Sequence, residues 1–196
     1  MPKFSAHERQ VIAEKIVAVA EELFCEYGLK KVTIEEIAKA SAIAKGSFYA
    51  FFPSKEELYF SILVDCQKRM WLQMEVYLAE NQQLAPRDLV KKTLLFMFEL
   101  MDQYPLIQNT DSETMALLLR KLPPEAVEAH SGEDAAALQL FEPYGIRFTQ
   151  PIDVVTKVFQ ALYGARVMME NEEKQMLDQV ISVMCEGLVN QLVEEK

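Results

Sequence analysis

The chain has little of what metal sites, disulfide frameworks and most catalytic sites are built from. It contains two histidines and three cysteines, Cys25, Cys66 and Cys185, which lie far apart. An odd number of cysteines without neighbouring histidines indicates neither a disulfide framework nor a zinc site. Since no nucleophile–base group, phosphate-binding loop or metal motif is present either, we expect no enzyme, no cofactor and no metal.

Helix-breaking residues and long apolar runs are also scarce. The chain has six glycines and eight prolines, and the stretches 54–85 and 152–163 contain neither, while 51% of all residues are hydrophobic. This composition favours helices around a sizeable core. No apolar run approaches the roughly 20 residues of a membrane span, and the N-terminus lacks the layout of a signal peptide. We therefore expect an all-α, cytoplasmic protein with no membrane partner.

An excess of positive charge is missing as well, although nucleic-acid-binding proteins commonly have one. The net charge is −10, but residues 1–60 carry eight Lys and Arg against nine Glu, a net of −1, whereas the other 136 residues carry 12 against 21 Asp and Glu, a net of −9. The negative excess therefore lies outside the N-terminal segment, where it would hold the rest of the chain away from DNA. DNA binding by residues 1–60 stays open.

Four Ser/Thr-x-x-Glu patterns predict where helices begin. They are 5–8, 33–36, 54–57 and 110–113, and in each the first side chain and the glutamate can satisfy each other's unpaired backbone amides. The first predicted helix ends near Gly28, and the second is short, from Ile34 to about Ala40. Another short helix near 44–51 stops ahead of Pro53, and a long helix follows Ser54. Three helices of this kind, with a tight break between the last two, match a helix-turn-helix.

The sequence after residue 85 predicts further helices, and the last two of them have an apolar face with no partner in the chain. Helices are expected after Pro86, near 111–122, 124–130 and 133–142, with a break at Ser131-Gly132, and at 150–170 and 172–194. The last two carry stripes of small or apolar residues that are too wide for one contact, which predicts a two-fold dimer. The residues expected in this interface are Ala161, Gly164, Ala165, Met168, Ile181, Met184 and Leu188.

The run TIEEIAKASAIAKGSFYAFFPSKEEL, from Thr33 to Leu58, resembles the signature of the TetR family almost position by position. The resemblance covers roughly residues 7–65 and implies a DNA-binding transcriptional regulator, whereas the body resembles the family only in length and helix content. It implies a fold with a three-helix head, residues 1–53, joined by a long helix to an α-helical ligand-binding and dimerisation body, residues 54–196. The bridge between them would be the helix from Ser54 to Leu78.

Residue chemistry in this run predicts the DNA contacts. Phe48 and Phe52 should anchor the recognition helix inward, and its outward face can then donate from a lysine to guanine, from a serine to base edges and from a tyrosine to phosphate. By resemblance, and because two of the positions begin helices, Thr33, Tyr49 and Lys55 are expected at phosphates. The full predicted DNA site is Thr33, Lys45, Gly46, Ser47, Tyr49, Ala50 and Lys55.

Two departures from the family pattern weaken the recognition helix. Ala42 stands where the family usually has glycine, which would strain a left-handed backbone by about 1 kcal/mol. Ala44 stands where the family usually has a capping serine or threonine, at a cost of roughly 0.5 to 2 kcal/mol. We therefore expect the head to dock on DNA but to discriminate modestly between sequences.

Methionines and aromatic residues of the body are predicted to line an effector pocket, because such side chains adapt to varied ligands. An ordinary helical core is the alternative for each of them. The candidate residues are Met70, Trp71, Met74, Phe96, Met101, Tyr104, Met115, Phe159 and Tyr163.

Together these features predict a homodimeric repressor that a small apolar or amphipathic effector releases from a palindromic operator. The expected partners are double-stranded DNA, a second copy of the chain and the effector. The alternative is a dimeric module with a degenerate head, which binds a small molecule or another partner but no DNA. Loss of DNA binding at low salt would distinguish this alternative.

Overall fold

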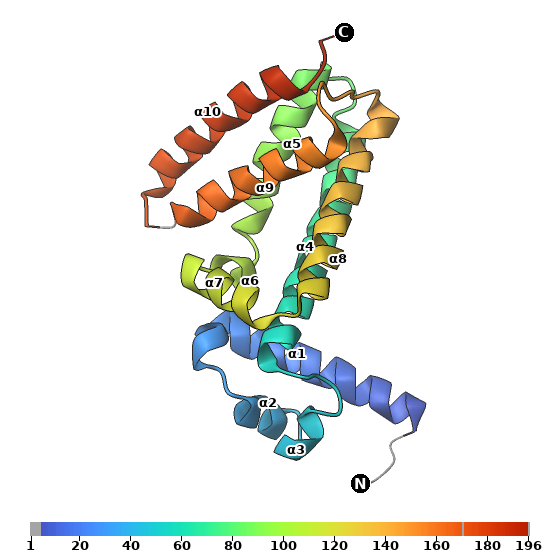
Figure 1. Cartoon of the computed structure of the whole chain (residues 1–196), viewed down its shortest axis with the longest axis vertical. Coiled ribbons are helices and arrows are strands. Elements are labelled where there is room, and N and C mark those ends of the chain that lie inside the picture. Colours follow the sequence, from blue (N-terminus) through green and yellow to red (C-terminus); the bar gives the residue numbers. More distant parts are fainter. Residues whose placement is uncertain (1–4, 170, 196) are drawn as a thin grey trace. The chain divides into compact units, whose positions relative to one another are not determined.

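The chain is helical throughout the part that the structure describes. The computed structural model describes the backbone of residues 5–169 and 171–195 and, outside 130–136, their side chains. The helices are α1 (Ala6–Lys31), α2 (Ile34–Ala40), α3 (Lys45–Phe48), α4 (Lys55–Glu80), α5 (Pro86–Met101), α6 (Pro105–Gln108), α7 (Ser112–Lys121), α8 (Pro124–Ala137), the 3₁₀ helix η1 (Leu138–Tyr144), α9 (Ile152–Met168) and α10 (Lys174–Leu192) (Figure 1). Only an isolated bridge between Phe148 and Val193 has strand geometry in this described part, so the predicted all-α class is confirmed.

The helices pack as two compact units whose composition the sequence did not predict. The first unit contains residues 1–66 and 104–122, and the second contains residues 67–103 and 123–196. The predicted head, residues 1–53, lies inside the first unit, which adds the first part of α4 together with α6 and α7. The units therefore do not coincide with the two segments 1–53 and 54–196.

The core of the first unit forms where α1 and α4 bury aromatic and aliphatic side chains. Phe24 and Tyr59 are fully buried and meet edge to face with their ring centroids 5.0 Å apart, an arrangement that aromatic pairs prefer. Helix α1 is interrupted at Gly28, where φ is 75°, and ends only at Lys31. The predicted end near Gly28 is therefore wrong: the glycine has a positive φ, but the helix resumes after it.

Three of the four predicted helix starts are confirmed. Ser5 and Thr33 form complete capping boxes with Glu8 and Glu36, and the Ser54 hydroxyl accepts a hydrogen bond from the Glu57 amide at 3.0 Å. The pattern at 110–113 is wrong as a cap. There Asp111 accepts the Thr114 amide at 2.6 Å, while the Thr110 hydroxyl is buried and lies 2.7 Å from the Tyr59 hydroxyl.

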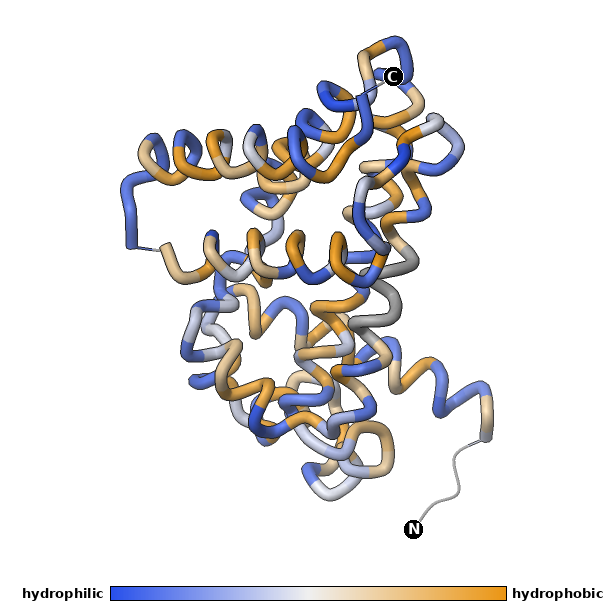
Figure 2. Tube along the Cα trace, turned by 45° about the horizontal axis from the view of Figure 1, so that its top comes forward, coloured by the Kyte–Doolittle hydropathy of each residue, from blue (hydrophilic) through white to orange (hydrophobic). Residues whose placement is uncertain are grey.

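The second unit is built on α5 and α10, which pack against each other, with α9 against α10 and α8. Asp102, just after α5, accepts hydrogen bonds from Arg166 of α9 and from Lys174 at the start of α10. The break predicted at residues 131–132 is wrong, because α8 runs continuously from Pro124 to Ala137. Along α9 and α10 hydrophobic and hydrophilic segments alternate (Figure 2).

None of the described helices is both long enough and apolar enough to cross a lipid bilayer.

Candidate nucleic-acid interface

The turn between α2 and α3 has the geometry that a helix-turn-helix needs. The Ala42 amide donates to the Lys39 carbonyl at 3.1 Å, and the Ile43 amide donates to the Ala38 carbonyl at 2.9 Å. Ala42 has φ 58°, and no other non-glycine residue in the described backbone has a positive φ. The site therefore does need a left-handed backbone, the condition under which the sequence predicted strain from an alanine Cβ.

Helix α3 is a single turn held from inside the head. It begins at Ala44, which provides no side-chain cap, as the sequence predicted. The Phe48 side chain is fully buried, and the Phe51 and Phe52 amides both donate to the Phe48 carbonyl, at 2.9 and 3.0 Å. The regular helix ends at Phe48 rather than near residue 51, so turns continue the expected recognition segment.

The outward face of this segment presents most of the predicted DNA-binding side chains. Lys45, Gly46, Tyr49 and Ala50 are exposed, with 55% of Tyr49 accessible, whereas Ser47 is half-buried. A Cβ added at Gly46 would meet no atom within 4 Å. Close packing inside the protein therefore does not require this glycine.

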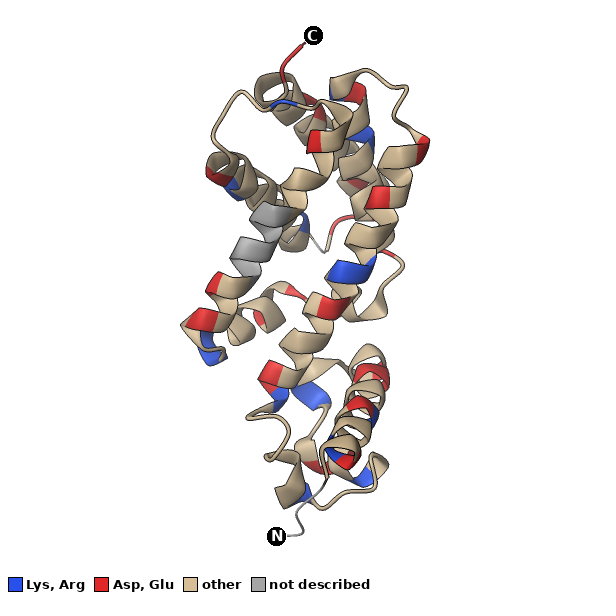
Figure 3. Ribbon diagram, turned by 90° about the vertical axis from the view of Figure 1, so that its right-hand side faces the viewer, with Lys and Arg blue, Asp and Glu red and all other residues tan. Residues whose placement is uncertain are grey.

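Carboxylates lie beside the cations of this face. Lys45 pairs with Glu35 at 3.2 Å, and both side chains are largely exposed. Two hydrogen bonds from Thr33, through its side chain and its backbone amide, lower the pKa of Glu36. Acidic and basic residues are interleaved on the head helices (Figure 3). An exposed pair such as Lys45–Glu35 contributes about 0 to 1 kcal/mol, so a phosphate or base could replace the glutamate.

Lys55 has a structural role that the sequence did not reveal. Its ammonium donates to the Leu29 carbonyl at 2.8 Å and to the Val32 carbonyl at 2.6 Å, at the end of α1. Carbonyls at a helix C-terminus lack partners within the helix, and a cation placed there satisfies them. Two of the three N–H donors of the ammonium are therefore used by these carbonyls. Only the third donor is available for the predicted contact between Lys55 and a phosphate.

Arg9, which the sequence did not single out, holds the end of the recognition segment. Its guanidinium donates to the Ala50 carbonyl at 2.9 Å and lies 5.2 Å from the centre of the Phe51 ring. The two residues are 41 positions apart, so no local pattern could have indicated the contact. Arg9 thereby ties the start of α1 to the residues that follow α3.

The segment that contains α6 is attached to α1 and α4 by polar contacts. The Asn109 side chain donates to the carbonyls of Phe24 and Cys25, at 3.3 and 2.6 Å, and the Tyr59 hydroxyl donates to the Leu106 carbonyl at 3.2 Å. Lys30 pairs with Asp111 and Glu113 near the start of α7. These contacts join residues 104–122 to the recognition unit, and the sequence showed no sign of them.

Comparison with known proteins identifies the head. Residues 16–62 match the family model described as "Bacterial regulatory proteins, tetR family". The head of this chain is therefore similar to the DNA-binding head of TetR-family regulators. The uncharacterized HTH-type transcriptional regulator YuxN of Bacillus subtilis is 46% identical over 48 residues, which are 24% of this chain and 16% of YuxN. The nucleoid occlusion factor SlmA of Glaesserella parasuis is 29% identical over 102 residues, 49% of this chain and 47% of SlmA.

The whole chain also shares the fold of TetR-family structures. A TetR-family transcriptional regulator from Pectobacterium atrosepticum superposes with a TM-score of 0.72 at 13% identity, covering 98% of this chain and 100% of that one. The sequence matches to YuxN and SlmA cover less than half of each relative. The resemblance to the family stated from residues 33–58 is confirmed.

The predicted effector residues are divided between the two units. Tyr104 and Met115 belong to the first unit, and the other seven belong to the second. Within the second unit Met70, Met74 and Met101 are buried and the rest are half-buried, and the Phe96 ring stacks on Tyr77 with centroids 4.3 Å apart. An effector site formed by these residues stays a prediction.

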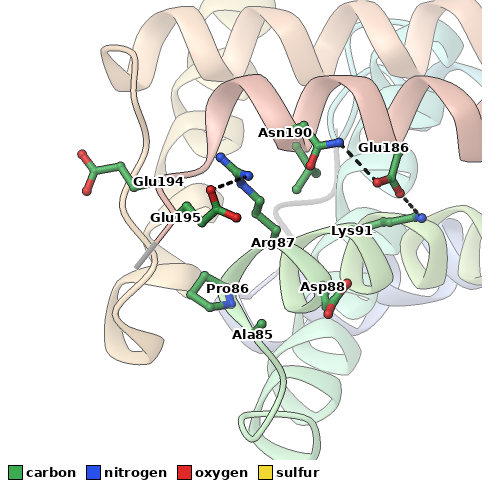
Figure 4. A pocket seen from close by; sticks show the side chains of 10 residues that line it. Ala85, Pro86, Arg87, Asp88, Lys91, Glu186, Asn190, Glu194 and Glu195 are labelled. Atoms are coloured by element: carbon green, nitrogen blue, oxygen red, sulfur yellow. Dashed lines mark hydrogen bonds and ion pairs between the residues drawn. The ribbon is translucent and has the colours of Figure 1, made fainter.

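A cleft of about 350 Å³ between the start of α5 and the end of α10 lies elsewhere in the second unit (Figure 4). Its two cations are both paired inside it, Arg87 with Glu195 at 3.4 Å and Lys91 with Glu186. The Lys91 hydrogen bond lowers the pKa of Glu186. The two cations of this cleft are therefore already paired with carboxylates of the protein.

The predicted dimerisation residues are unevenly exposed. Met168 is 81% exposed, and Ala161 is exposed too. Ile181 is only 3% exposed, because it faces the interior of the second unit, and Gly164, Ala165, Met184 and Leu188 are half-buried. Val183 on α10 is 73% exposed, and the sequence did not select it.

Proposed function

We propose that this protein is a homodimeric TetR-type repressor that binds a palindromic DNA operator and is released by a small apolar or amphipathic effector. The observation that carries the proposal is the exposed α3 segment, which follows a left-handed turn in a head that matches the TetR-family model. Two such heads related by a two-fold axis would enter successive major grooves about 34 Å apart.

The proposed DNA contacts are of two kinds: contacts to phosphates, which position the protein, and contacts to bases, which recognise the sequence. Tyr49, at 55% exposure, can donate to a phosphate oxygen, as can Thr33 and the third donor of Lys55. Lys45 and Ser47 reach base edges, and Gly46 and Ala50 allow close approach of the backbone. Since Glu35 competes for Lys45, one lysine and one half-buried serine give modest discrimination.

The dimer would form through exposed apolar residues of α9 and α10. Met168 and Val183 are large apolar side chains that are 81% and 73% exposed, and Ile152, Val154 and Met176 on the same two helices are exposed as well. With Ala161 and the half-buried Gly164, Ala165, Met184 and Leu188, Met168 and Val183 would make up the dimer face. Ile181 contributes to the core beneath this face.

Effector binding would be coupled to the head through the segments of chain that connect the two units. Helix α4 begins in the first unit and ends in the second, and α6 returns from the second unit to contact α1. An effector that favours one arrangement of these helices would change the separation of the two heads, and the dimer would then no longer match one helical turn of DNA.

Selection of genomic fragments by the purified protein, followed by anisotropy titration of the selected duplex, tests DNA binding. With about four phosphates contacted by each head, affinity should fall with salt at a log–log slope near −7, by the rule of roughly −0.9 for each phosphate. Tyr49→Phe should weaken binding to all sequences about equally, and Lys45→Gln should change the preference between them by about 1 to 3 kcal/mol.

Lys121→Gln on exposed α7 is the matched control, since it removes a positive charge from the same unit away from α3. Equal losses in Lys45→Gln and Lys121→Gln would contradict base reading by Lys45. A stable dimer that retains no fragment even at low salt would instead support the second candidate, a module with a degenerate head. The strained Ala42 and the uncapped α3 are the observations that favour this candidate.

A further inference from the structure

The Lys45–Glu35 ion pair lies on the face of the head that is proposed to contact DNA. The Lys45 Nζ is 3.2 Å from the Glu35 Oε2, and the two side chains are 59% and 74% exposed. Lys45 is the first residue of α3, and Glu35 lies in the first turn of α2, ten positions earlier. The pair therefore bridges the two helices of the helix-turn-helix and presents one donor and one acceptor side by side.

The two neighbouring carboxylates in the first turn of α2 have different partners. Glu36 accepts hydrogen bonds from the Thr33 amide and hydroxyl, at 2.8 and 2.7 Å, and so completes the cap of the helix. Glu35 takes no part in this capping box and accepts from Lys45 instead. The sequence of α3, Lys-Gly-Ser-Phe, contains no acidic residue of its own. Glu35 is therefore the carboxylate that accompanies Lys45 on this face.

The turn between α2 and α3 fixes the backbones that carry this pair. Two backbone hydrogen bonds return from residues 42–43 to the end of α2, and the buried Phe48 holds α3 from inside the head. Only the side chains of Glu35 and Lys45 then need to adjust when DNA is bound, and a preorganised site loses less free energy to ordering.

A G·C pair presents the complementary pattern in the major groove. Guanine offers acceptors at O6 and N7, and cytosine offers a donor at N4. Since O6 and N4 are hydrogen-bonded to each other within the base pair, they lie about 2.9 Å apart, close to the 3.2 Å between Nζ and Oε2. A lysine that donates to guanine thus brings a glutamate at its side within reach of the cytosine N4.

An A·T pair fits the two side chains less well. Its N6 donor has the N7 acceptor on one side and the O4 acceptor on the other, and a methyl group follows O4. If Glu35 accepts from N6, the Lys45 ammonium therefore keeps a single acceptor. Only guanine offers two adjacent acceptors to the three donors of an ammonium.

We propose that Lys45 and Glu35 together recognise one G·C pair in each half-site, with Lys45 donating to guanine O6 and N7 and Glu35 accepting from cytosine N4. Because this base pair would belong to the operator, the assignment rests on the proposed function. On other sequences the Glu35 carboxylate would lie near phosphates of like charge without a donor from a base. Glu35 is thus a specificity-determining residue that weakens binding in general and favours the G·C pair.

Anisotropy titrations of the selected duplex at fixed salt, with one base pair changed at a time, test the assignment. Replacing one particular G·C pair in each half-site by A·T should weaken binding by about tenfold, which corresponds to ~1.4 kcal/mol. At that pair, 7-deazaguanine lacks the N7 acceptor, and N4-methylcytosine carries a methyl group in place of the major-groove N4 hydrogen. Each analogue should weaken binding by about threefold or more, because it removes one contact.

Two variants assign the two contacts. Lys45→Met keeps the aliphatic stem without the donor and should bind guanine and 7-deazaguanine equally. Glu35→Ala removes the acceptor and should bind cytosine and N4-methylcytosine equally, while it stays sensitive to 7-deazaguanine. It should also bind other sequences at least as tightly as the unmodified chain, since a negative charge near the phosphates is lost. Glu22→Ala, which removes an exposed carboxylate from α1, is the matched control and should keep both sensitivities.

The outcomes separate the base-pair assignment from the proposed function. If the chain binds its selected duplex and neither analogue changes the affinity, the assignment is wrong and the proposed function stands. The assignment is also wrong if Glu35→Ala responds to N4-methylcytosine as the unmodified chain does. If the chain retains no duplex even at low salt, the proposed function is wrong and the assignment fails with it.

Discussion

Helices α1 and α2 begin with complete capping boxes, whereas α3 begins at Ala44 with no side-chain cap and follows a strained left-handed alanine. The first two helices are stabilised by residues within a few positions in the sequence. Helix α3 depends instead on the buried Phe48 and on Arg9, which donates to the Ala50 carbonyl. The difference shows that the starts of α1 and α2 are locally encoded, while the recognition segment owes its order to tertiary contacts.

The largest effect is expected when the side chain that anchors α3, Phe48, is removed. Phe48→Ala should destabilise the protein by about 3 to 5 kcal/mol, because a fully buried phenylalanine is replaced by a cavity. Urea denaturation followed by circular dichroism measures the loss. Tyr49→Ala, one residue further and largely exposed, is the matched control and should cost less than ~1 kcal/mol. Similar losses in both variants would show that Phe48 does not anchor α3.

The second test concerns Lys55, which donates hydrogen bonds to the carbonyls at the end of α1. Lys55→Met should destabilise the protein by about 1 to 3 kcal/mol, since the Leu29 and Val32 carbonyls lose their donor while the aliphatic stem is kept. Thermal unfolding in the absence of DNA measures the effect. Lys39→Met, an exposed lysine on α2, is the control. If Lys55→Met lowers DNA affinity without any loss of stability, the phosphate contact matters more than the carbonyls.

The smallest expected effect comes from giving α3 the cap that it lacks. Ala44→Ser should stabilise the protein by roughly 0.5 to 2 kcal/mol, because the hydroxyl can accept from an amide of the first turn. Denaturation midpoints measure this gain. Thr33→Ala, which removes the existing cap of α2, should cost about 1 kcal/mol and is measured in the same way. An unchanged midpoint in Ala44→Ser would mean that tertiary contacts already hold α3 in place.

Local patterns predicted much of the head. The caps at Ser5, Thr33 and Ser54, the bounds of α2 and the positive φ at Ala42 could all be read from the sequence, because each depends on residues at most a few positions apart. The pattern at Thr110 failed as a cap because Asp111 next to it is an equally good capping residue, and a buried contact with Tyr59 took the threonine hydroxyl.

Contacts between distant residues escaped prediction for a general reason. The hydrogen bond from Arg9 to Ala50 spans 41 positions, and that from Asn109 to Cys25 spans 84. Neither residue type nor spacing announces such pairs, because any exposed arginine or asparagine offers the same donors. The candidate site therefore gained Arg9 only from the structure.

The sequence by itself determined that this protein is all-α, that its head contains a helix-turn-helix and that α3 lacks a cap, since propensity, capping and turn chemistry act over short distances; the TetR type of the head came from the resemblance of residues 33–58. Only the tertiary structure decided that residues 104–122 join the head, that Lys55 serves the α1 carbonyls and that Glu35 lies beside Lys45. Burial and hydrogen-bond satisfaction depend on which surfaces meet, and that is fixed when the whole chain packs.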